Sequence, residues 1–246
     1  ESSEAANWLR HIMRSSGAHY RDFAVLYRSN IQSRPFELAF RQAGIPYVVI
    51  GGQDFFERAE VKDVISYLKV MANPRDESAF LRIVNMPRRG IGDALLHQAH
   101  DLCREEKCSI GKALAKILER GMASSRGEQG IRTFLGLMQT YRRRFKRPDV
   151  SLRDTTKDLI LDIDYAGEID RMSKNREQAM MRLENVDVVL QAIEQYEKEA
   201  ASPSLSGFLD QTHLDSESVS ESKQQENGNA VRLMTIHSAK GLEFPF

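Results

Sequence analysis

The feature that most constrains the fold is the placement of three short apolar runs that have the length of buried strands. Residues 23–27 and 47–50 lie on either side of a helical pattern that starts near Pro35 and ends at Gly44. Two strands joined by a helix form a βαβ unit, which implies a parallel sheet. The third run, residues 231–235, lies near the other end of the sequence. We therefore expect an α/β domain that is interrupted and then resumed.

The long stretch between these runs has the helical period. Val61, Val64, Ile65, Leu68 and Met71 form one apolar stripe, and Asp76 is a good N-cap for the helix that follows. We predict helices at 4–16, 57–73, 77–85, 93–106, 109–120, 128–145, 151–164, 176–198 and 204–213. Residues 215–229 are rich in Ser, Glu, Gln and Asn, which is typical of a flexible linker.

These patterns predict an α/β chain with a large all-α insertion, in which a partial parallel sheet is interrupted by a helical domain. We place the first part of the sheet domain at 1–66 and the inserted helical domain at 67–214. The linker follows at 215–229, and the returning strand with its loop occupies 230–246.

The charge balance limits the class of function. The chain has 35 Lys and Arg residues against 35 Asp and Glu residues. A net charge of zero excludes a polybasic protein that binds nucleic acid by bulk charge, although a local basic face remains open. No apolar run approaches the ~20 residues that span a membrane, and no secretory signal is visible. We expect a cytoplasmic protein without a membrane partner, with Cys103 and Cys108 as reduced thiols.

No complete catalytic motif is present. The phosphate-binding pattern GxxxxGK[ST] is absent, and so are GxGxxG, HExxH and GxSxG. The sequence therefore offers no catalytic residue and no metal ligand of its own.

The segment Pro87-Arg-Arg-Gly-Ile-Gly92 is the most informative loop. Gly90 and Gly92 before a helix start would present backbone N–H groups to an anion, and Ile91 would anchor the turn in the core. Arg88 and Arg89 add positive charge. The loop is thus a candidate phosphate contact, and an ordinary tight turn is the alternative. The basic stretch 141–147 is interpreted first as a solvated helix face and second as a patch for duplex DNA.

Four segments carry a family resemblance. Residues 27–34, 51–63, 79–92 and 233–244 resemble, in this order, motifs of the C-terminal half of UvrD/PcrA/Rep-type superfamily 1 DNA helicases. The resemblance implies a second RecA-like domain with a helical insertion. It also implies ATP and Mg²⁺ in the full-length enzyme, held mainly by a first RecA-like domain that carries the phosphate-binding loop. We therefore interpret the chain as a fragment that alone binds no cofactor and hydrolyses no ATP.

The resemblance also assigns roles to single residues. It makes Arg28 and Arg34 phosphate contacts on single-stranded DNA, and it places Thr235 and His237 along the same strand. It makes Glu243 a contact to the nucleotide ribose, since a carboxylate accepts hydrogen bonds from hydroxyls. An ion pair for Arg28, a loop-fixing role for Thr235 and His237, and a capping or surface role for Glu243 are the alternatives.

By the same resemblance, residues 88–92 grip the backbone of duplex DNA. The implied function is a part of an ATP-dependent 3′-to-5′ DNA helicase, with single-stranded and duplex DNA, the first RecA-like domain, and repair or replication proteins as partners. The alternative is a regulatory module that autoinhibits or recruits the motor, because residues 105–230 carry no motif that can be interpreted.

Overall fold

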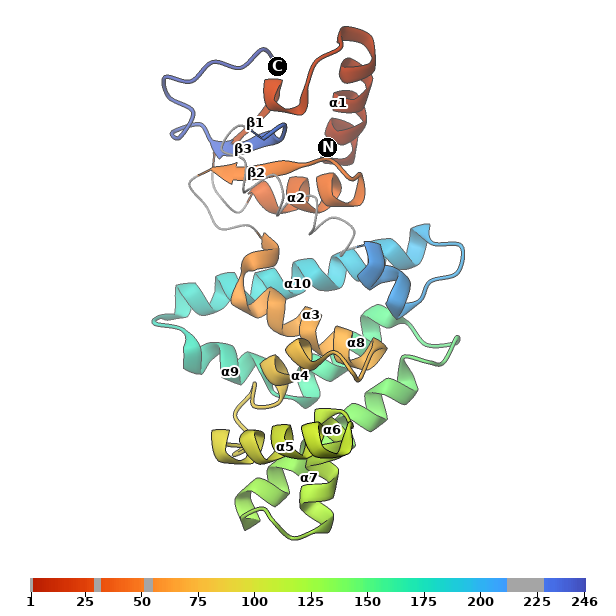
Figure 1. Cartoon of the computed structure of the whole chain (residues 1–246). Helices are drawn as coiled ribbons and strands as arrows, with labels where there is room; N and C mark the ends of the chain where they lie inside the picture. The colour runs from red at the N-terminus through yellow and green to blue at the C-terminus, as the bar shows by residue number, and fades with distance from the viewer. Residues whose placement is uncertain (1, 29–31, 51–54, 212–227) are drawn as a thin grey trace. The chain divides into compact units, whose positions relative to one another are not determined.

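The computed structural model describes residues 2–28, 32–50, 55–211 and 228–246 (Figure 1). Its backbone contacts divide the chain into two compact units. The sheet unit comprises 1–58 and 207–246, and the helical unit comprises Ala59–Ser206. Most of the predicted linker at 215–229, and the last residues of the predicted helix at 204–213, lie outside the described residues.

The sheet unit contains a parallel three-stranded sheet. Its strands are β1 (Ala24–Tyr27), β2 (Tyr47–Ile50) and β3 (Val231–Thr235), in the order β1-β3-β2. Both pairings are parallel, with Tyr27 opposite Thr235 and Ile50 opposite Met234. The predicted parallel sheet is confirmed, and the strand from the far end of the chain forms its centre. β1 and β2 therefore flank β3 instead of pairing with each other.

Two helices belong to this sheet, α1 (Ser2–Ser16) and α2 (Ser33–Gln42). Leu9 of α1, Phe40 of α2 and Leu233 of β3 meet in one buried cluster. Ala6 and Leu9 are the buried residues of α1, whereas Trp8 is 54% exposed and its ring meets Phe23 edge-on, with centroids 6.4 Å apart.

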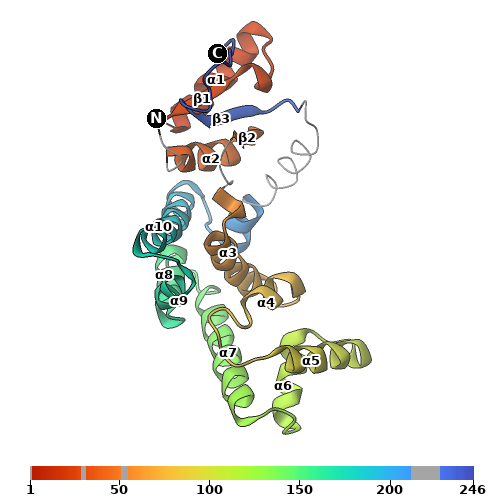
Figure 2. The ribbon, with the colours of Figure 1, turned by 90° about the vertical axis from the view of Figure 1, so that its left-hand side faces the viewer.

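The helical unit contains eight helices in its described residues (Figure 2). They are α3 (Ala59–Ala72), α4 (Glu77–Ile83), α5 (Asp93–Glu106), α6 (Ile110–Glu119), α7 (Ser125–Arg144), α8 (Leu152–Asp162), α9 (Tyr165–Met172) and α10 (Arg176–Glu199). Seven of these match predicted helices. The sequence pattern did not predict α9, because it is short, contains Gly167 and starts directly after a left-handed residue, Asp164 (φ 51°).

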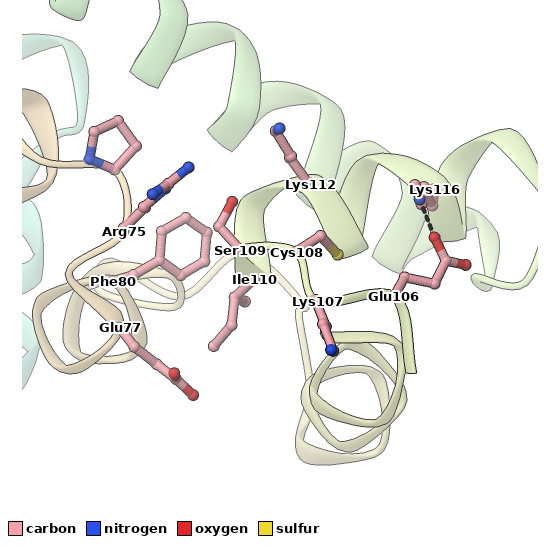
Figure 3. Close-up of a pocket in the computed structure, with 11 residues that line it drawn as sticks. Arg75, Glu77, Phe80, Glu106, Lys107, Cys108, Ser109, Ile110, Lys112 and Lys116 are labelled. Carbon is pink, nitrogen blue, oxygen red and sulfur yellow. Dashed lines mark hydrogen bonds and ion pairs between the residues drawn. The ribbon is translucent and has the colours of Figure 1, made fainter. Parts of the chain in front are cut away.

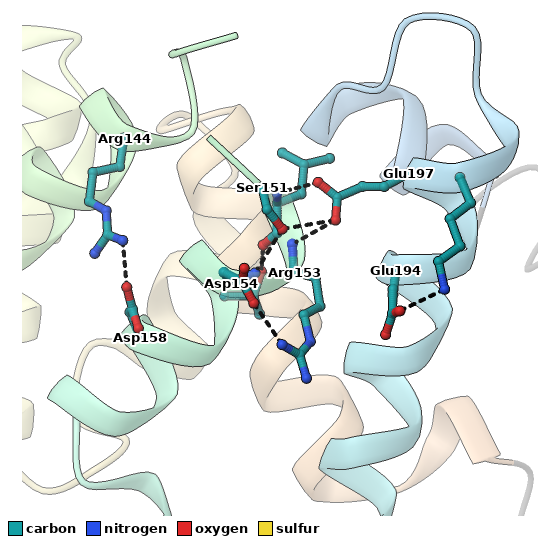
Figure 4. Close-up of polar contacts among 10 residues, drawn as sticks. Arg144, Ser151, Arg153, Asp154, Asp158, Glu194 and Glu197 are labelled. Carbon is teal, nitrogen blue, oxygen red and sulfur yellow. Dashed lines mark hydrogen bonds and ion pairs between the residues drawn. The ribbon is translucent and has the colours of Figure 1, made fainter. Parts of the chain in front are cut away.

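Polar side chains fix several helix ends in this unit. The Asp76 carboxylate accepts a hydrogen bond from Ala79 N at 2.9 Å, which confirms the predicted cap of α4. Glu197 of α10 reaches the start of α8, where it accepts hydrogen bonds from Ser151 Oγ (3.0 Å) and Leu152 N (2.5 Å) (Figure 4). A capping carboxylate from another helix ties the two helices together as well as satisfying free N–H groups.

A buried polar network joins α3 to three other helices. The Asp63 carboxylate accepts hydrogen bonds from Arg82 Nε and Tyr165 Oη, each at 2.7 Å, and Asn185 donates to Glu60. Burial raises the pKa of Asp63 above its usual value, against the opposing effects of Tyr165 and Arg82. None of the helices in the described part of the chain is long and apolar enough to cross a membrane.

Candidate nucleic-acid interface

The sheet unit brings three of the predicted contacts to one edge of the sheet. Arg28 follows β1 and Thr235 ends β3, and Tyr27 and Thr235 are register partners. Ile236 N donates a hydrogen bond to Tyr27 O at 2.9 Å, so the chain stays beside β1 as it leaves β3. His237 and Arg28 are both exposed at this edge. The carboxyl ends of parallel strands are where such sheets bind ligands.

The Thr235 hydroxyl organises the turn that presents His237. It accepts a hydrogen bond from Ser238 N at 3.2 Å and lies 2.9 Å from Ser238 Oγ. Gly241 in the same segment has φ +84°, a left-handed conformation that favours glycine. These bonds agree with the loop-fixing alternative for Thr235, whose contact to DNA stays a prediction, and His237 is exposed to solvent.

Glu243 lies on the segment that returns along β1. Phe246 N donates to Asp22 O and Ala24 N donates to Phe246 O, both at 3.1 Å. The Phe246 ring stacks on Phe23 with centroids 4.9 Å apart. Glu243 is exposed just before these contacts, where its carboxylate is available as a hydrogen-bond acceptor.

Arg34 requires a correction. Arg34 is only 4% exposed, so it is not a surface residue that a DNA strand could contact in this structure. It lies on a buried polar face of α2 together with Ser33, Glu37 and Arg41. The Glu37 carboxylate accepts hydrogen bonds from Ser33 Oγ and Phe55 N, each at 2.6 Å. This face was not predicted, although the four-residue spacing of Ser33, Glu37 and Arg41 indicates it in the sequence.

The second candidate interface is the loop 88–92 of the helical unit. Ile91 is fully buried, as predicted for an anchor. Gly90 has φ +78°, and Gly92 is the N-cap of α5 with ordinary backbone angles. The N-cap Gly92 has no side chain that could cap the start of α5, and Asp93 is the acidic residue of its first turn. An uncapped helix N-terminus on the surface favours an anion.

The two arginines of this loop do different things. Arg88 is exposed, whereas the Arg89 guanidinium points into the protein. It donates to Ile83 O (3.0 Å), Pro87 O (3.1 Å) and Tyr67 Oη (2.6 Å). Arg89 therefore holds the loop to the end of α4, and its role as a DNA contact stays a prediction. Burial raises the pKa of Tyr67 to about 12, and the phenol stays protonated at neutral pH.

Glycines show where the loop packs closely and where it is open. A Cβ at Gly130 of α7 would overlap the carbonyl oxygen of Arg89, so only glycine lets the loop lie against this helix. A Cβ at Gly92 would meet no described atom within 4 Å. Neither backbone strain nor packing thus demands a glycine at 92. Close approach of a ligand is a physical reason for one.

The chain matches known proteins over its whole length. Residues 1–246 match the family described as UvrD-like helicase C-terminal domain. The chain is 32% identical over 249 residues to the ATP-dependent DNA helicase PcrA of Staphylococcus aureus (strain Mu50 / ATCC 700699), and 33% identical over 249 residues to that of Staphylococcus epidermidis (strain ATCC 12228 / FDA PCI 1200). Each alignment covers 100% of this chain and 33% of the relative. The chain therefore spans about a third of the length of the curated relatives it matches.

Proposed function

Because the chain belongs to the UvrD-like helicase C-terminal domain family, we propose that it forms the DNA-contacting part of an ATP-dependent 3′-to-5′ DNA helicase. Family membership confirms the resemblance that the four sequence motifs predict. The coupling of ATP hydrolysis to movement along DNA, the duplex and single-stranded substrates, and repair or replication partners are parts of this proposal.

The observation that carries the proposal is the loop 88–92. It combines a helix N-terminus without a capping side chain on its N-cap, an exposed Arg88, and Gly92, where a Cβ would meet no described atom within 4 Å. Backbone N–H groups and one arginine recognise phosphate without reading bases. This chemistry suits a helicase, which has to hold duplex DNA of any sequence.

The sheet edge supplies the contacts to single-stranded DNA in this proposal. Arg28 follows β1 and His237 follows β3, the two strands are paired, and both residues are exposed. An imidazole and a guanidinium can both donate hydrogen bonds to phosphate. Thr235 acts by holding the turn, through its hydroxyl and Ser238.

The residues of this chain fit only a small part of an ATP site. Glu243 is an exposed acceptor that suits ribose hydroxyls. The described residues contain no group of three or more His, Cys, Asp or Glu side chains that could hold a metal ion, and the sequence lacks a phosphate-binding loop. We propose that ATP and Mg²⁺ are held mainly by the first RecA-like domain and that this chain alone hydrolyses no ATP.

The experiment compares duplex binding by wild type and Gly92→Glu, using fluorescence anisotropy with a duplex that carries a 3′ single-stranded tail. The new carboxylate would occupy the phosphate position without strain, since the site is open and its backbone angles are ordinary. We expect about a tenfold loss of affinity at low salt.

Two controls make the result specific. Gly92→Ala adds a Cβ without charge, and Gln191→Glu adds the same charge on an exposed position of α10. Gln191→Glu should bind like wild type, whereas Gly92→Ala should lose part of the affinity, because its Cβ hinders the close approach of a phosphate. Equal affinity of wild type and Gly92→Glu would remove the loop from the duplex interface, and no binding by wild type at low salt would refute DNA contact by this chain.

A further inference from the structure

The structure separates the five basic residues of 142–147 into two groups. Arg144 pairs with Asp158 and Arg147 pairs with Asp149, each at 2.5 Å (Figure 4 shows the first pair). Arg142, Arg143 and Lys146 are exposed, and none of them forms an ion pair with a described residue. Solubility alone does not explain why these three unpaired cations lie together on one side of the helix end.

These three cations line one hollow between α6 and α7, which we call the α6–α7 groove. It has a volume of about 600 Å³, and Lys112 of α6 is the fourth cation on its wall. No carboxylate is among its lining residues. The formal net charge of the chain is zero, so four cations without an acid give this groove a locally positive potential that attracts anions.

A second hollow of about 600 Å³ continues the groove at the start of α6. The two share Pro74, Phe80, Ser109 and Lys112, and the second adds Arg75, Lys107 and Lys116 (Figure 3). Its carboxylates are Glu77 and Glu106. Glu106 already accepts ion pairs from Lys116 and Arg120, which lower its pKa. The positive surface therefore extends beyond α7.

The start of α6 strengthens this surface. Ser109 is its N-cap but makes no side-chain capping bond, and the first turn contains no acidic residue. The positive end of the helix dipole thus adds to the lysine and arginine charges at this place. A cation at the C-terminal end of α7 is explained by that helix's own dipole, but Lys112 at the N-terminal end of α6 is not.

The floor of the groove indicates what kind of anion it fits. Val70, Phe80, Leu135 and Met138 line the groove beside its four cations, so its lining is apolar as well as cationic. Gly111 and Gly136 also line it, and a Cβ at Gly136 would meet no described atom within 4 Å. An open floor with cationic walls suits an extended, evenly charged chain.

We propose that the α6–α7 groove is a second contact for the phosphate backbone of DNA, separate from the loop 88–92. The proposal rests on the proposed function in taking DNA as the partner. Arg143 lies about 20 Å along α7 from Gly130, which packs against the loop, at 1.5 Å per residue. No exposed aromatic side chain lines the groove, so it contacts the backbone and does not stack bases.

The test neutralises the groove and measures salt dependence. The variant is Arg142→Gln/Arg143→Gln/Lys146→Gln, and the matched control is Arg132→Gln/Arg147→Gln/Lys198→Gln. The control removes the same charge from exposed cations that are already ion-paired. Anisotropy with the tailed duplex between low and moderate salt should show about a tenfold weaker affinity for the groove variant. Its log–log salt slope should fall by about 1 for each phosphate that the groove no longer binds.

Lys112→Gln is the second groove variant. Lys112 lies on α6, so replacing it does not remove a cation that stabilises the C-terminal end of α7. It should lower the slope by about 1 while circular dichroism shows an unchanged fold. Wild-type affinity and slope in both groove variants, with weakened binding in Gly92→Glu, would overturn the groove proposal and leave the proposed function intact. Weakened groove variants with an unaffected Gly92→Glu would support the groove and refute the loop.

An acidic protein segment is the competing occupant. A fluorescent poly-glutamate peptide, tested on the same variants, distinguishes it from DNA. Peptide binding that disappears in the groove triple variant, together with unchanged DNA binding, would overturn the proposal in favour of a protein-docking groove.

Discussion

The two units of the chain build their candidate DNA contacts in opposite ways. In the sheet unit, Arg28 and Thr235 belong to segments at opposite ends of the sequence, and the β1–β3 register brings them together. In the helical unit, Arg88 and Gly92 lie within one short loop. The first interface exists only when the sheet forms, whereas the second needs a local turn and one helix to pack against. The comparison teaches that neighbouring residues reveal a local site, while a composite site needs the topology.

The two units are alike in one respect, because each turns an arginine of its motif inward. Arg34 of the sheet unit is buried on the polar face of α2, and Arg89 of the helical unit is turned inward onto backbone carbonyls. Both came from motifs in which arginine was predicted to contact phosphate. An arginine in a motif therefore has to be tested for exposure before it is assigned to a ligand, because its five donors satisfy buried carbonyls equally well.

The largest effect is expected where the loop meets α7. Gly130→Ala would drive a methyl group into the Arg89 carbonyl, and the resulting shift should cost about 1–3 kcal/mol of unfolding free energy. Urea unfolding measures this change. Duplex affinity should fall as well, because the loop that we propose as a phosphate contact is displaced.

The matched control for this prediction is Gly136→Ala on the same helix. Its Cβ would meet no described atom within 4 Å, so the better helix propensity of alanine should raise stability by up to about 1 kcal/mol. Opposite signs at the two positions are expected. A harmless Gly130→Ala would show that the loop does not depend on this close approach.

A smaller effect is expected at the sheet edge. Thr235→Val removes the hydroxyl that bonds Ser238 and should cost about 0.5–1.5 kcal/mol, measured by thermal unfolding. Thr235→Ser keeps the hydroxyl and should preserve the turn. Binding to a single-stranded oligonucleotide should weaken in the valine variant alone, since His237 loses its position. Weakening in the serine variant alone would instead point to a contact made by the threonine methyl group, which valine keeps.

The smallest effect is a change in pH dependence within the helical unit. Because the folded pKa of Asp63 is raised, its neutral form stabilises the fold fully below about pH 4, the pKa of an unfolded aspartate. That stability is lost as the pH rises through the folded pKa. Asp63→Asn stays neutral, so its stability relative to wild type should improve as the pH is raised from about 4 to 7.

Urea unfolding at several pH values measures this change, with exposed Asp101→Asn as the control for the chemical replacement. A constant difference between wild type and Asp63→Asn across this range would mean that Arg82 and Tyr165 fully compensate the buried charge.

Much of the fold could be predicted because it depends on neighbours in the sequence. The apolar stripe of α3, the Asp76 cap of α4 and the buried Ile91 all follow from spacing over a few residues. The exposure of Trp8 could not be predicted, because a helix has several possible apolar faces and only the packing partner selects one. The short α9 was missed for a related reason, since its position is supported by the contact of Tyr165 with Asp63.

The sequence alone determined the alternation of strands and helices, the parallel sheet, the anchored glycine loop and the family. Local hydrogen bonding, side-chain periodicity and motif spacing carry that information. Tertiary structure alone decided that β3 lies between β1 and β2, that Arg34 and Arg89 point inward, and that Lys112 joins the unpaired cations of α7. These outcomes depend on which distant groups meet during packing, because burial and charge pairing are properties of the folded surface.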